Sequence, residues 1–225
     1  MERPVPHILL IDNTPRRGGE VHPRTRLLEE ILRSYPAAVR TIHYRDVGPA
    51  SADGAAAIVL SGSAHNMSED ATKEAMQPVV ELVRDTELPV LGICFGFHLL
   101  LHAYGCEIRR NPRSGEFCLP EGLVKDIHVA RGGGIMAAGR HPVNVAHRDY
   151  VRPDDPALAG RFVIHAVSRD GEIEYLQYAS HVERPVHAVQ FHPEAYAAAP
   201  DEVKRAGAAV LHGFVAACCT SRRGV

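Results

Sequence analysis

The residues best suited to chemistry are a cysteine and, almost a hundred positions later, a histidine and a glutamate. Cys94 lies in LGICFGFHLLL, between an apolar run and an apolar segment of helical character. A thiol at a strand-to-helix turn lies near the unpaired N–H groups of the helix start, which stabilise a thiolate. Gly92 and Gly96 leave room for a tight turn that presents a nucleophile. A buried core thiol is the alternative, and the local pattern does not decide between the two.

The segment AVQFHPE contains His192 and Glu194 on either side of Pro193. Residues two apart in an extended segment point to the same side, so the carboxylate can orient the imidazole. The imidazole can then act as the base for a thiol from another segment. A surface turn explains this segment when it is taken alone. Together with Cys94, the pattern favours a Cys-His-Glu nucleophilic site.

Strands and helices that alternate over the first hundred residues must position these groups. Apolar runs predict strands at 7–12, 37–44, 55–63 and 88–94, and helical spacing predicts helices at 24–35, 69–84 and 96–105. Pro78 is expected to break or kink the second helix. The alternation predicts a mostly parallel sheet with helices on both faces.

The middle of the chain, residues 107–190, contains short β-rich pieces separated by Gly, Pro and Asp turns, which predicts an antiparallel extension of the same domain. The segment PVHAVQFHPE then returns to a buried strand, and an amphipathic helix starts near Asp201. Ligands bind at the carboxyl ends of parallel strands. We therefore expect the Gly62-Ser63 turn, Cys94 and the His192-Glu194 pair at one edge of the sheet.

Composition limits the function classes. The 225 residues, 45% hydrophobic, suit one domain over 1–225, and the net charge of −2 without a basic block argues against nucleic acid as a partner. The apolar run before Asp12 is too short for a signal peptide or membrane span, so we expect a cytoplasmic protein with no membrane partner. Five irregularly spaced cysteines suit a reduced compartment.

These motifs resemble the class I glutamine amidotransferases, specifically their GMP-synthetase-like branch, which shares a superfamily with the γ-glutamyl hydrolases. GICFGFHLL is similar to the nucleophile motif, AVQFHPE to the His/Glu motif, VLSGSAHNMSED to the oxyanion loop and AHRDYV to a His-x-Asp-x-Val segment. EIRRNPRSGEF resembles the stretch after the nucleophile helix. The resemblance implies a three-layer, flavodoxin-like α/β fold with a small antiparallel β extension.

The resemblance also implies a reaction. Cys94 would attack the glutamine carboxamide to give a γ-glutamyl thioester, which water hydrolyses to glutamate, and ammonia would be the other product. His192 would transfer the proton and Glu194 would orient it. Backbone N–H groups at Phe95 and near Gly62 and Ser63 would hold the oxyanion. The family uses no metal or organic cofactor for this half-reaction.

Three further residues are expected to contact the substrate: His98, His147 and Asp149. The family usually has Gln where this chain has His98, and imidazole has a different shape and donor/acceptor set. The donor is then bound differently, or is not free glutamine. The spacing of Cys94, His98 and His102 superficially suggests a metal site. We expect none, because Cys94 precedes the helix and His102 lies beside core leucines.

Three functions follow. The first is a glutaminase subunit that supplies ammonia to a synthetase or biosynthetic enzyme on a separate chain, since the sequence has no GxxxxGK[ST] loop or second catalytic domain. The second is a stand-alone γ-glutamyl hydrolase or peptidase, which His98 slightly favours. The third is a non-catalytic regulatory module, which the presence of Cys94, His192 and Glu194 disfavours.

Overall fold

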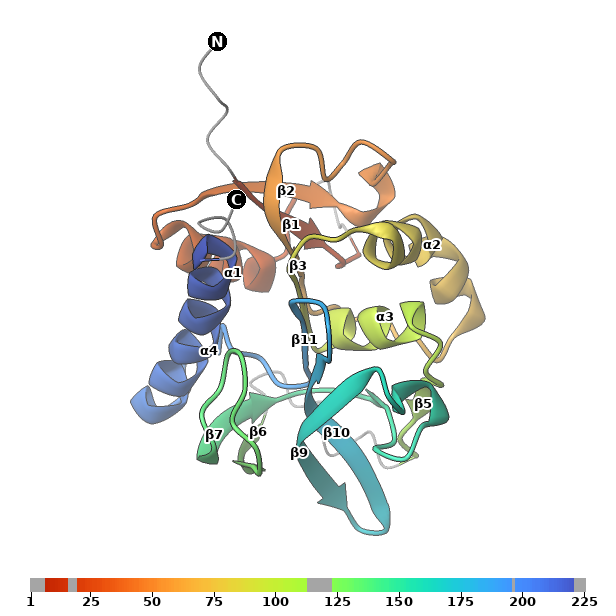
Figure 1. Ribbon diagram of the computed structural model, residues 1–225, viewed down its shortest axis with the longest axis vertical. Helices are drawn as coiled ribbons and strands as arrows, with labels where there is room; N and C mark the ends of the chain where they lie inside the picture. The colour runs from red at the N-terminus through yellow and green to blue at the C-terminus, as the bar shows by residue number, and fades with distance from the viewer. Residues whose placement is uncertain (1–6, 16–19, 113–122, 196, 221–225) are drawn as a thin grey trace.

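A central sheet lies between two layers of helices in the computed structural model, which describes residues 7–15, 20–112, 123–195 and 197–220 (Figure 1). In spatial order the strands of this sheet are β2 (Ala38–His43), β1 (His7–Asp12), β3 (Ala55–Leu60), β4 (Val90–Ile93), β11 (Val186–Val189), β10 (Ile173–His181) and β9 (Phe162–Asp170). The first five are parallel, and β10 and β9 follow in antiparallel pairings. The mostly parallel sheet predicted from the sequence is confirmed.

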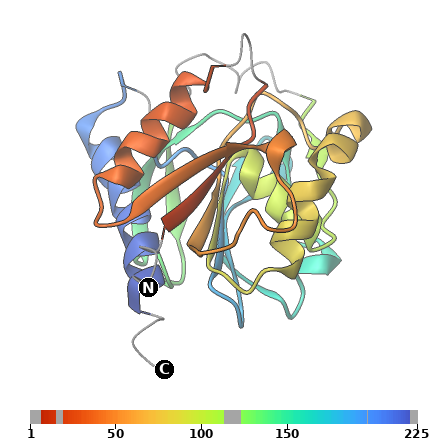
Figure 2. The same cartoon turned by 90° about the horizontal axis from the view of Figure 1, so that it is seen from above.

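The helices divide between the two faces of the sheet (Figure 2). On one face lie α1 (Pro23–Arg33) and α4 (Asp201–Thr220), and on the other α2 (Asp70–Asp85) and α3 (Phe95–Ala103). Side chains of β1 alternate between the two cores: Ile8 and Leu10 pack with the first pair of helices, and Leu9 and Ile11 with the second. A strand covered on both faces needs apolar residues at every position, which explains the unbroken run in HILLI.

Helix α2 continues through Pro78, so the break that was one of the two outcomes expected at this proline does not occur. Pro78 lies on the exposed face of the helix, where water can bind the carbonyl oxygen that loses its N–H partner. Val79, Val80 and Val83 on the opposite face are buried against the sheet and α3. Packing of this apolar face therefore outweighs the cost of the proline.

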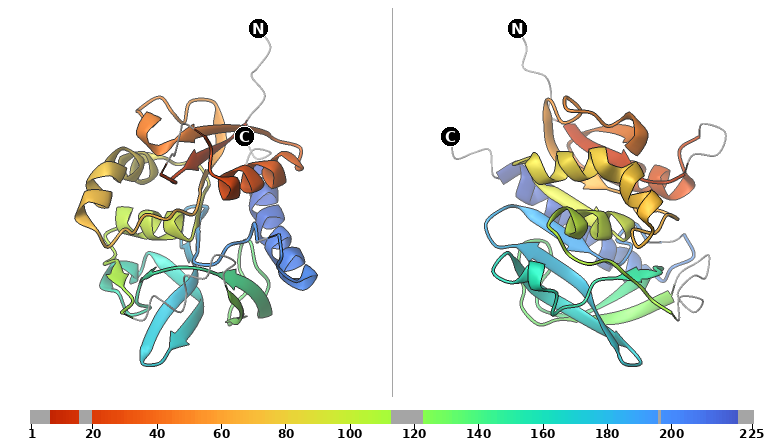
Figure 3. Two further views of the ribbon diagram at one scale, coloured as in Figure 1. Left: turned by 180° about the vertical axis from the view of Figure 1, so that it is seen from behind. Right: turned by 90° about the vertical axis from the view of Figure 1, so that its right-hand side faces the viewer.

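The antiparallel extension lies at the end of the molecule remote from β2 (Figure 3). Strands β6 (Leu123–Val129) and β7 (Gly139–Val145) pair with each other, β7 packs against α4 and β6 against β9, and β5 (Arg109–Arg110) pairs with β8 (Asp149–Tyr150). Short 3-10 turns η1 (Tyr44–Asp46) and η2 (Pro156–Leu158) complete the regular elements of the described ranges. None of the helices in these ranges has the length and hydropathy needed to cross a membrane.

The parallel strands end together at one edge of the sheet. The N–H of Ser61 donates to Ile11 O (3.1 Å), and that of Cys94 to Val189 O (2.9 Å), so the segments after β1, β3, β4 and β11 lie side by side. These are the segments that carry the predicted chemical groups. The structure therefore brings them to the common edge expected from strand polarity.

Candidate active site

Cys94 occupies a sharp elbow between β4 and α3, as the flanking glycines indicated. Its φ of 51° and ψ of −100° lie in a region that residues with a side chain rarely adopt, at a cost of about 1–3 kcal/mol. A Cβ on Gly92 would lie 2.5 Å from Gly96 O, and one on Gly96 would lie 2.4 Å from Leu60 O. Neither position tolerates a side chain without a backbone shift, so both glycines are required for this turn.

His192 and Glu194 follow β11 and form a buried pair, with the Nδ1 of His192 2.7 Å from the Oε1 of Glu194. The His192 backbone N–H donates to Asn144 O of β7 (2.8 Å). Helix α4 packs closely on the other side, since a Cβ on Gly207 would lie 2.0 Å from Pro193 O. The segment is therefore held from two directions, and its imidazole has a fixed orientation.

The pKa of His192 reflects its charged neighbours. Burial alone lowers it, but electrostatic attraction to Cys94 and Glu194, with hydrogen bonds to both, raises the pKa well above its ordinary value of 6.5. The imidazole is therefore biased toward its protonated form. A proton held there, beside the thiol, is what acid catalysis of amide cleavage requires.

Gly62 connects this pair to the cysteine. A Cβ at Gly62 would lie 2.8 Å from His192 Cε1 and 3.7 Å from Cys94 Cβ. The turn after β3, the elbow after β4 and the segment after β11 therefore meet at one point. Ser63 follows in the same turn, and Phe95 is the first residue of α3, where backbone N–H groups have no partner within the helix.

His98 and His147 are two further buried histidines near the elbow. The Nε2 of His98 lies 2.7 Å from the Oε1 of Gln190, and the Nδ1 of His147 lies 2.9 Å from Asp149 O. Burial is the main cause that lowers the pKa of His98, and it lowers the pKa of His147 to about 3. Both rings are neutral near pH 7, in contrast to His192.

The carboxylate of Asp149 holds the far end of the loop that begins at Gly62. It accepts hydrogen bonds from the Ser68 N–H (2.9 Å) and hydroxyl (2.8 Å), and Arg110 Nη1 lies 3.5 Å away. Its side chain is buried, so these partners compensate for the loss of solvation. A substrate contact by Asp149 stays a prediction; the observed contact is structural.

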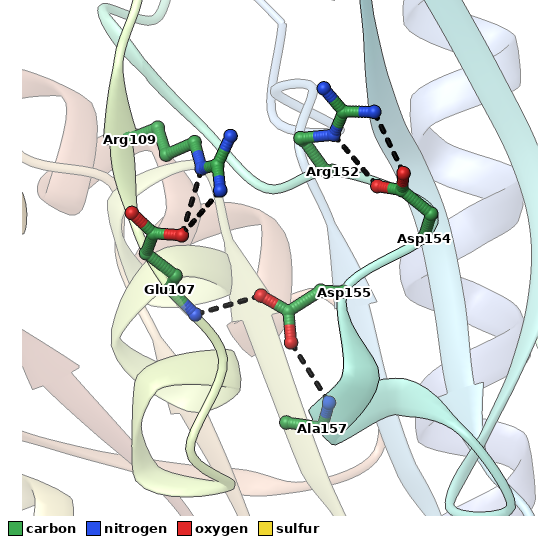
Figure 4. A network of polar contacts seen from close by, with 6 residues as sticks. All are labelled: Glu107, Arg109, Arg152, Asp154, Asp155 and Ala157. Atoms are coloured by element: carbon green, nitrogen blue, oxygen red, sulfur yellow. Dashed lines mark hydrogen bonds and ion pairs between the residues drawn. The ribbon is translucent and has the colours of Figure 1, made fainter.

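Figure 4 shows the network that anchors the β5–β8 pair. The Asp155 carboxylate accepts from the backbone N–H groups of Glu107 and Ala157, both at 2.9 Å. Arg109 pairs with Glu107, and Arg152 pairs with Asp154. Exposed ion pairs add little stability, but the Asp155 carboxylate joins the backbone at Glu107, between α3 and β5, to the start of η2. Residues 113–117 of EIRRNPRSGEF, Glu116 included, lie outside the described residues.

Sequence reasoning missed Gln190 and Ser68. Gln190 lies inside the motif AVQFHPE, so the motif was an available signal, whereas nothing in the sequence connects Ser68 to Asp149.

In the described ranges no three His, Cys, Asp or Glu side chains are placed to hold a metal ion. Cys94 precedes α3 and His102 lies about two turns further along, half-buried.

The fold and the site define an α/β protein with a cysteine at a strand-to-helix elbow beside a His–Glu pair. More particularly, the chain belongs to the class I glutamine amidotransferase family, whose model matches residues 24–204. The chain is 28% identical to the glutamine-hydrolysing subunit of GMP synthase from Thermoplasma volcanium, over 94% of this chain and 91% of that protein. The corresponding protein of Thermoplasma acidophilum is 26% identical, over 96% and 94%.

Solved structures share the fold. A Thermoplasma acidophilum protein described as a subunit of GMP synthase superimposes with a TM-score of 0.76 and 22% identity, over 97% of this chain and 96% of that one. A glutamine amidotransferase from Thermotoga maritima gives a TM-score of 0.66 and 15% identity, over 94% and 97%.

The elbow generates a prediction about stability. Gly96→Ala should lower the free energy of unfolding by about 2 kcal/mol or more, because the added methyl group meets backbone atoms of Leu60. Gly48→Ala is the matched control, since a Cβ there has no neighbour within 4 Å. Urea unfolding monitored by circular dichroism measures both variants. Equal midpoints for the two would contradict the close packing of α3 against β3.

Proposed function

We propose that this chain hydrolyses the γ-carboxamide of glutamine and supplies the ammonia to a synthetase on a separate chain. The observation that carries the proposal is the Cys94 elbow beside the His192–Glu194 pair, within a class I glutamine amidotransferase fold. The names of the relatives support the assignment, because they describe a glutamine-hydrolysing subunit of GMP synthase. They favour it over a stand-alone γ-glutamyl hydrolase and over a non-catalytic module.

The first step is acylation of the thiol. The Cys94 sulfur attacks the carboxamide carbon, and the oxyanion accepts hydrogen bonds from the N–H groups of Phe95 and the Gly62-Ser63 turn. His192 then gives its proton to the nitrogen, the C–N bond breaks and ammonia leaves. The raised pKa of His192 supports this role as the acid.

The second step is hydrolysis of the thioester. His192, now neutral, takes a proton from water as the water attacks the γ-glutamyl carbon, and the C–S bond breaks to release glutamate. The carboxylate of Glu194 keeps Nδ1 fixed through its 2.7 Å contact, so that Nε2 is presented to the thiol and the water. This step regenerates the starting charge state of Cys94 and His192.

Donor binding is assigned to the buried polar groups beside the elbow. His98 with Gln190 forms one part of this group, and the segment His147 to Asp149 forms another, with Ala146 O 3.3 Å from the Cys94 sulfur. Each neutral imidazole has one N–H, which donates to Gln190 Oε1 in His98 and to Asp149 O in His147, so the other ring nitrogen is an acceptor. An acceptor of this kind is suited to the ammonium group at the amino-acid end of a γ-glutamyl donor.

The central test is Cys94→Ala. We expect it to reduce glutamate and ammonia release by at least roughly a thousandfold, because no nucleophile remains, with an unchanged circular dichroism spectrum. Cys106→Ala is the control: that thiol is also buried, and burial raises its pKa to about 12, so it supplies no thiolate. Retention of turnover in Cys94→Ala would remove the mechanism.

The partner assignment has its own test. The tagged chain, expressed in its native cell, should copurify with a synthetase, and adding that partner should raise the rate of glutamine hydrolysis roughly tenfold or more. Tagged Cys94→Ala is the matched bait, since it should recover the same partner without hydrolysing glutamine. Full glutaminase activity of the isolated chain, with no partner recovered, would argue for a stand-alone hydrolase.

Substitution at His98 tests donor recognition. We expect His98→Gln to lower KM for glutamine roughly three- to tenfold, the value of about one hydrogen bond, with a smaller effect on kcat. His102→Gln on the same helix, half-buried and away from the elbow, should change neither constant. Steady-state kinetics with glutamine and a panel of γ-glutamyl compounds measures both variants. An unchanged KM in His98→Gln would make this histidine a packing residue.

A further inference from the structure

We propose that Asn13 is a positioning residue that holds the oxyanion turn, residues Ser61–Ser63, in the geometry needed to acylate Cys94. Asn13 lies directly after β1 and is fully buried, with no part in the triad. Its catalytic consequence rests on the proposed function. The contact between Asn13 and the turn is a property of the fold and is tested separately below.

Three hydrogen bonds connect Asn13 to the turn. Its backbone N–H donates to the hydroxyl of Ser61 (3.0 Å), and its side-chain Nδ2 donates to Ser61 O (2.9 Å). Its backbone carbonyl oxygen accepts from the hydroxyl of Ser63 (2.7 Å). The amide Oδ1 has no partner among the described residues, so the donor is the side-chain group that holds the turn.

This arrangement sets the plane of the Gly62–Ser63 peptide. The Ser61 hydroxyl oxygen accepts from the backbone N–H of Asn13. The proton of the Ser61 hydroxyl is therefore directed to Gly62 O (3.0 Å). In a trans peptide the carbonyl and the following N–H point in opposite directions, so the Ser63 N–H faces away from Asn13. In the part of the chain that the structure describes, this N–H has no acceptor. It is therefore a donor available for an oxyanion at Cys94.

The support beneath Asn13 is rigid. The adjacent Asp12, also fully buried, accepts hydrogen bonds through Oδ1 from the N–H and hydroxyl of Thr14 and from the hydroxyl of Thr25 in α1. The end of β1 is thereby fixed to α1 before it contacts the turn. Gly62 lies against His192 and Cys94, so a shift of the turn would move the oxyanion donor relative to the nucleophile.

The test compares Asn13→Ala and Asn13→Asp with Gln77→Ala. Both substitutions at Asn13 remove the Nδ2 donor to Ser61 O and keep the two backbone hydrogen bonds, and the aspartate keeps the shape of the side chain but replaces the donor by a negatively charged acceptor. Gln77 is the control, because it is an exposed amide side chain of α2, outside the turn, that donates to Glu81. Three quantities are measured: deuterium uptake of peptides covering residues 61–67, kcat and KM for glutamine, and the rate of Cys94 alkylation by iodoacetamide.

Both Asn13 variants should exchange the amides of residues 61–67 roughly tenfold faster, because the turn opens more often. Their kcat should fall roughly ten- to a hundredfold with little change in KM, since an oxyanion exists only in the transition state and intermediate. Alkylation of Cys94 forms no oxyanion and should keep its wild-type rate. Gln77→Ala should match the wild type in all three.

The outcomes separate this inference from the proposed function. Unchanged deuterium exchange in both Asn13 variants would show that the Asn13 side chain does not hold the oxyanion turn, whatever the activity. Faster exchange with unchanged kcat, in an active wild-type protein, overturns its catalytic role. Equal losses of kcat and alkylation rate would mean general damage and also count against it. If the wild-type protein turns over no γ-glutamyl compound, the proposed function fails, and exchange still decides whether Asn13 holds the turn.

Discussion

The contact between the start of α3 and the end of β3 is the constraint on which the rest of the site depends. Helix α3 can approach the sheet only because Gly96 has no side chain opposite Leu60 O, and that approach forces Cys94 into its left-handed conformation. The strain is offset by the burial of Phe97, Leu100 and Leu101 against the same core. Packing of an apolar helix thus supplies the energy that presents a single sulfur at the sheet edge.

Buried carboxylates organise the loops around that sulfur. Asp12, Asp149 and Glu194 are each almost fully buried, and each is bound to a different segment: Asp12 to α1, Asp149 to Ser68 and Glu194 to His192. Removing a carboxylate from water costs several kcal/mol unless partners replace the solvent. Both oxygens of Asp149 have partners, whereas Asp12 and Glu194 each have partners at one oxygen, and their Oδ2 and Oε2 have none among the described residues. Displacement of one of these loops would remove the hydrogen bonds that the buried carboxylate does have.

Much of this arrangement could be predicted from the sequence, because it depends on local periodicity and strand polarity. The run HILLI, the GICFG elbow and the HPE segment each identify an element and its place at the sheet edge. Pairings between distant side chains could not be predicted. His98 with Gln190, Asp149 with Ser68 and Asn13 with Ser61 join residues 48 to 92 positions apart. Pro78 does not end α2, because packing of the apolar face of the helix against the core outweighs the low helix propensity of proline.

Three buried histidines show how position assigns different protonation states to the same side chain. Burial lowers the pKa of each. For His98 it outweighs the opposing effects of the Asp149 charge and the hydrogen bond to Gln190, and for His147 positive neighbours lower the pKa further, so both rings stay neutral. His192 has both the thiol and Glu194 against it, and its pKa rises. In the proposed mechanism one imidazole then carries the reacting proton while the other two shape the donor site. If all three histidines were charged, their mutual repulsion would lower the pKa of His192. The neutral state of His98 and His147 avoids that repulsion and so helps His192 to keep its proton.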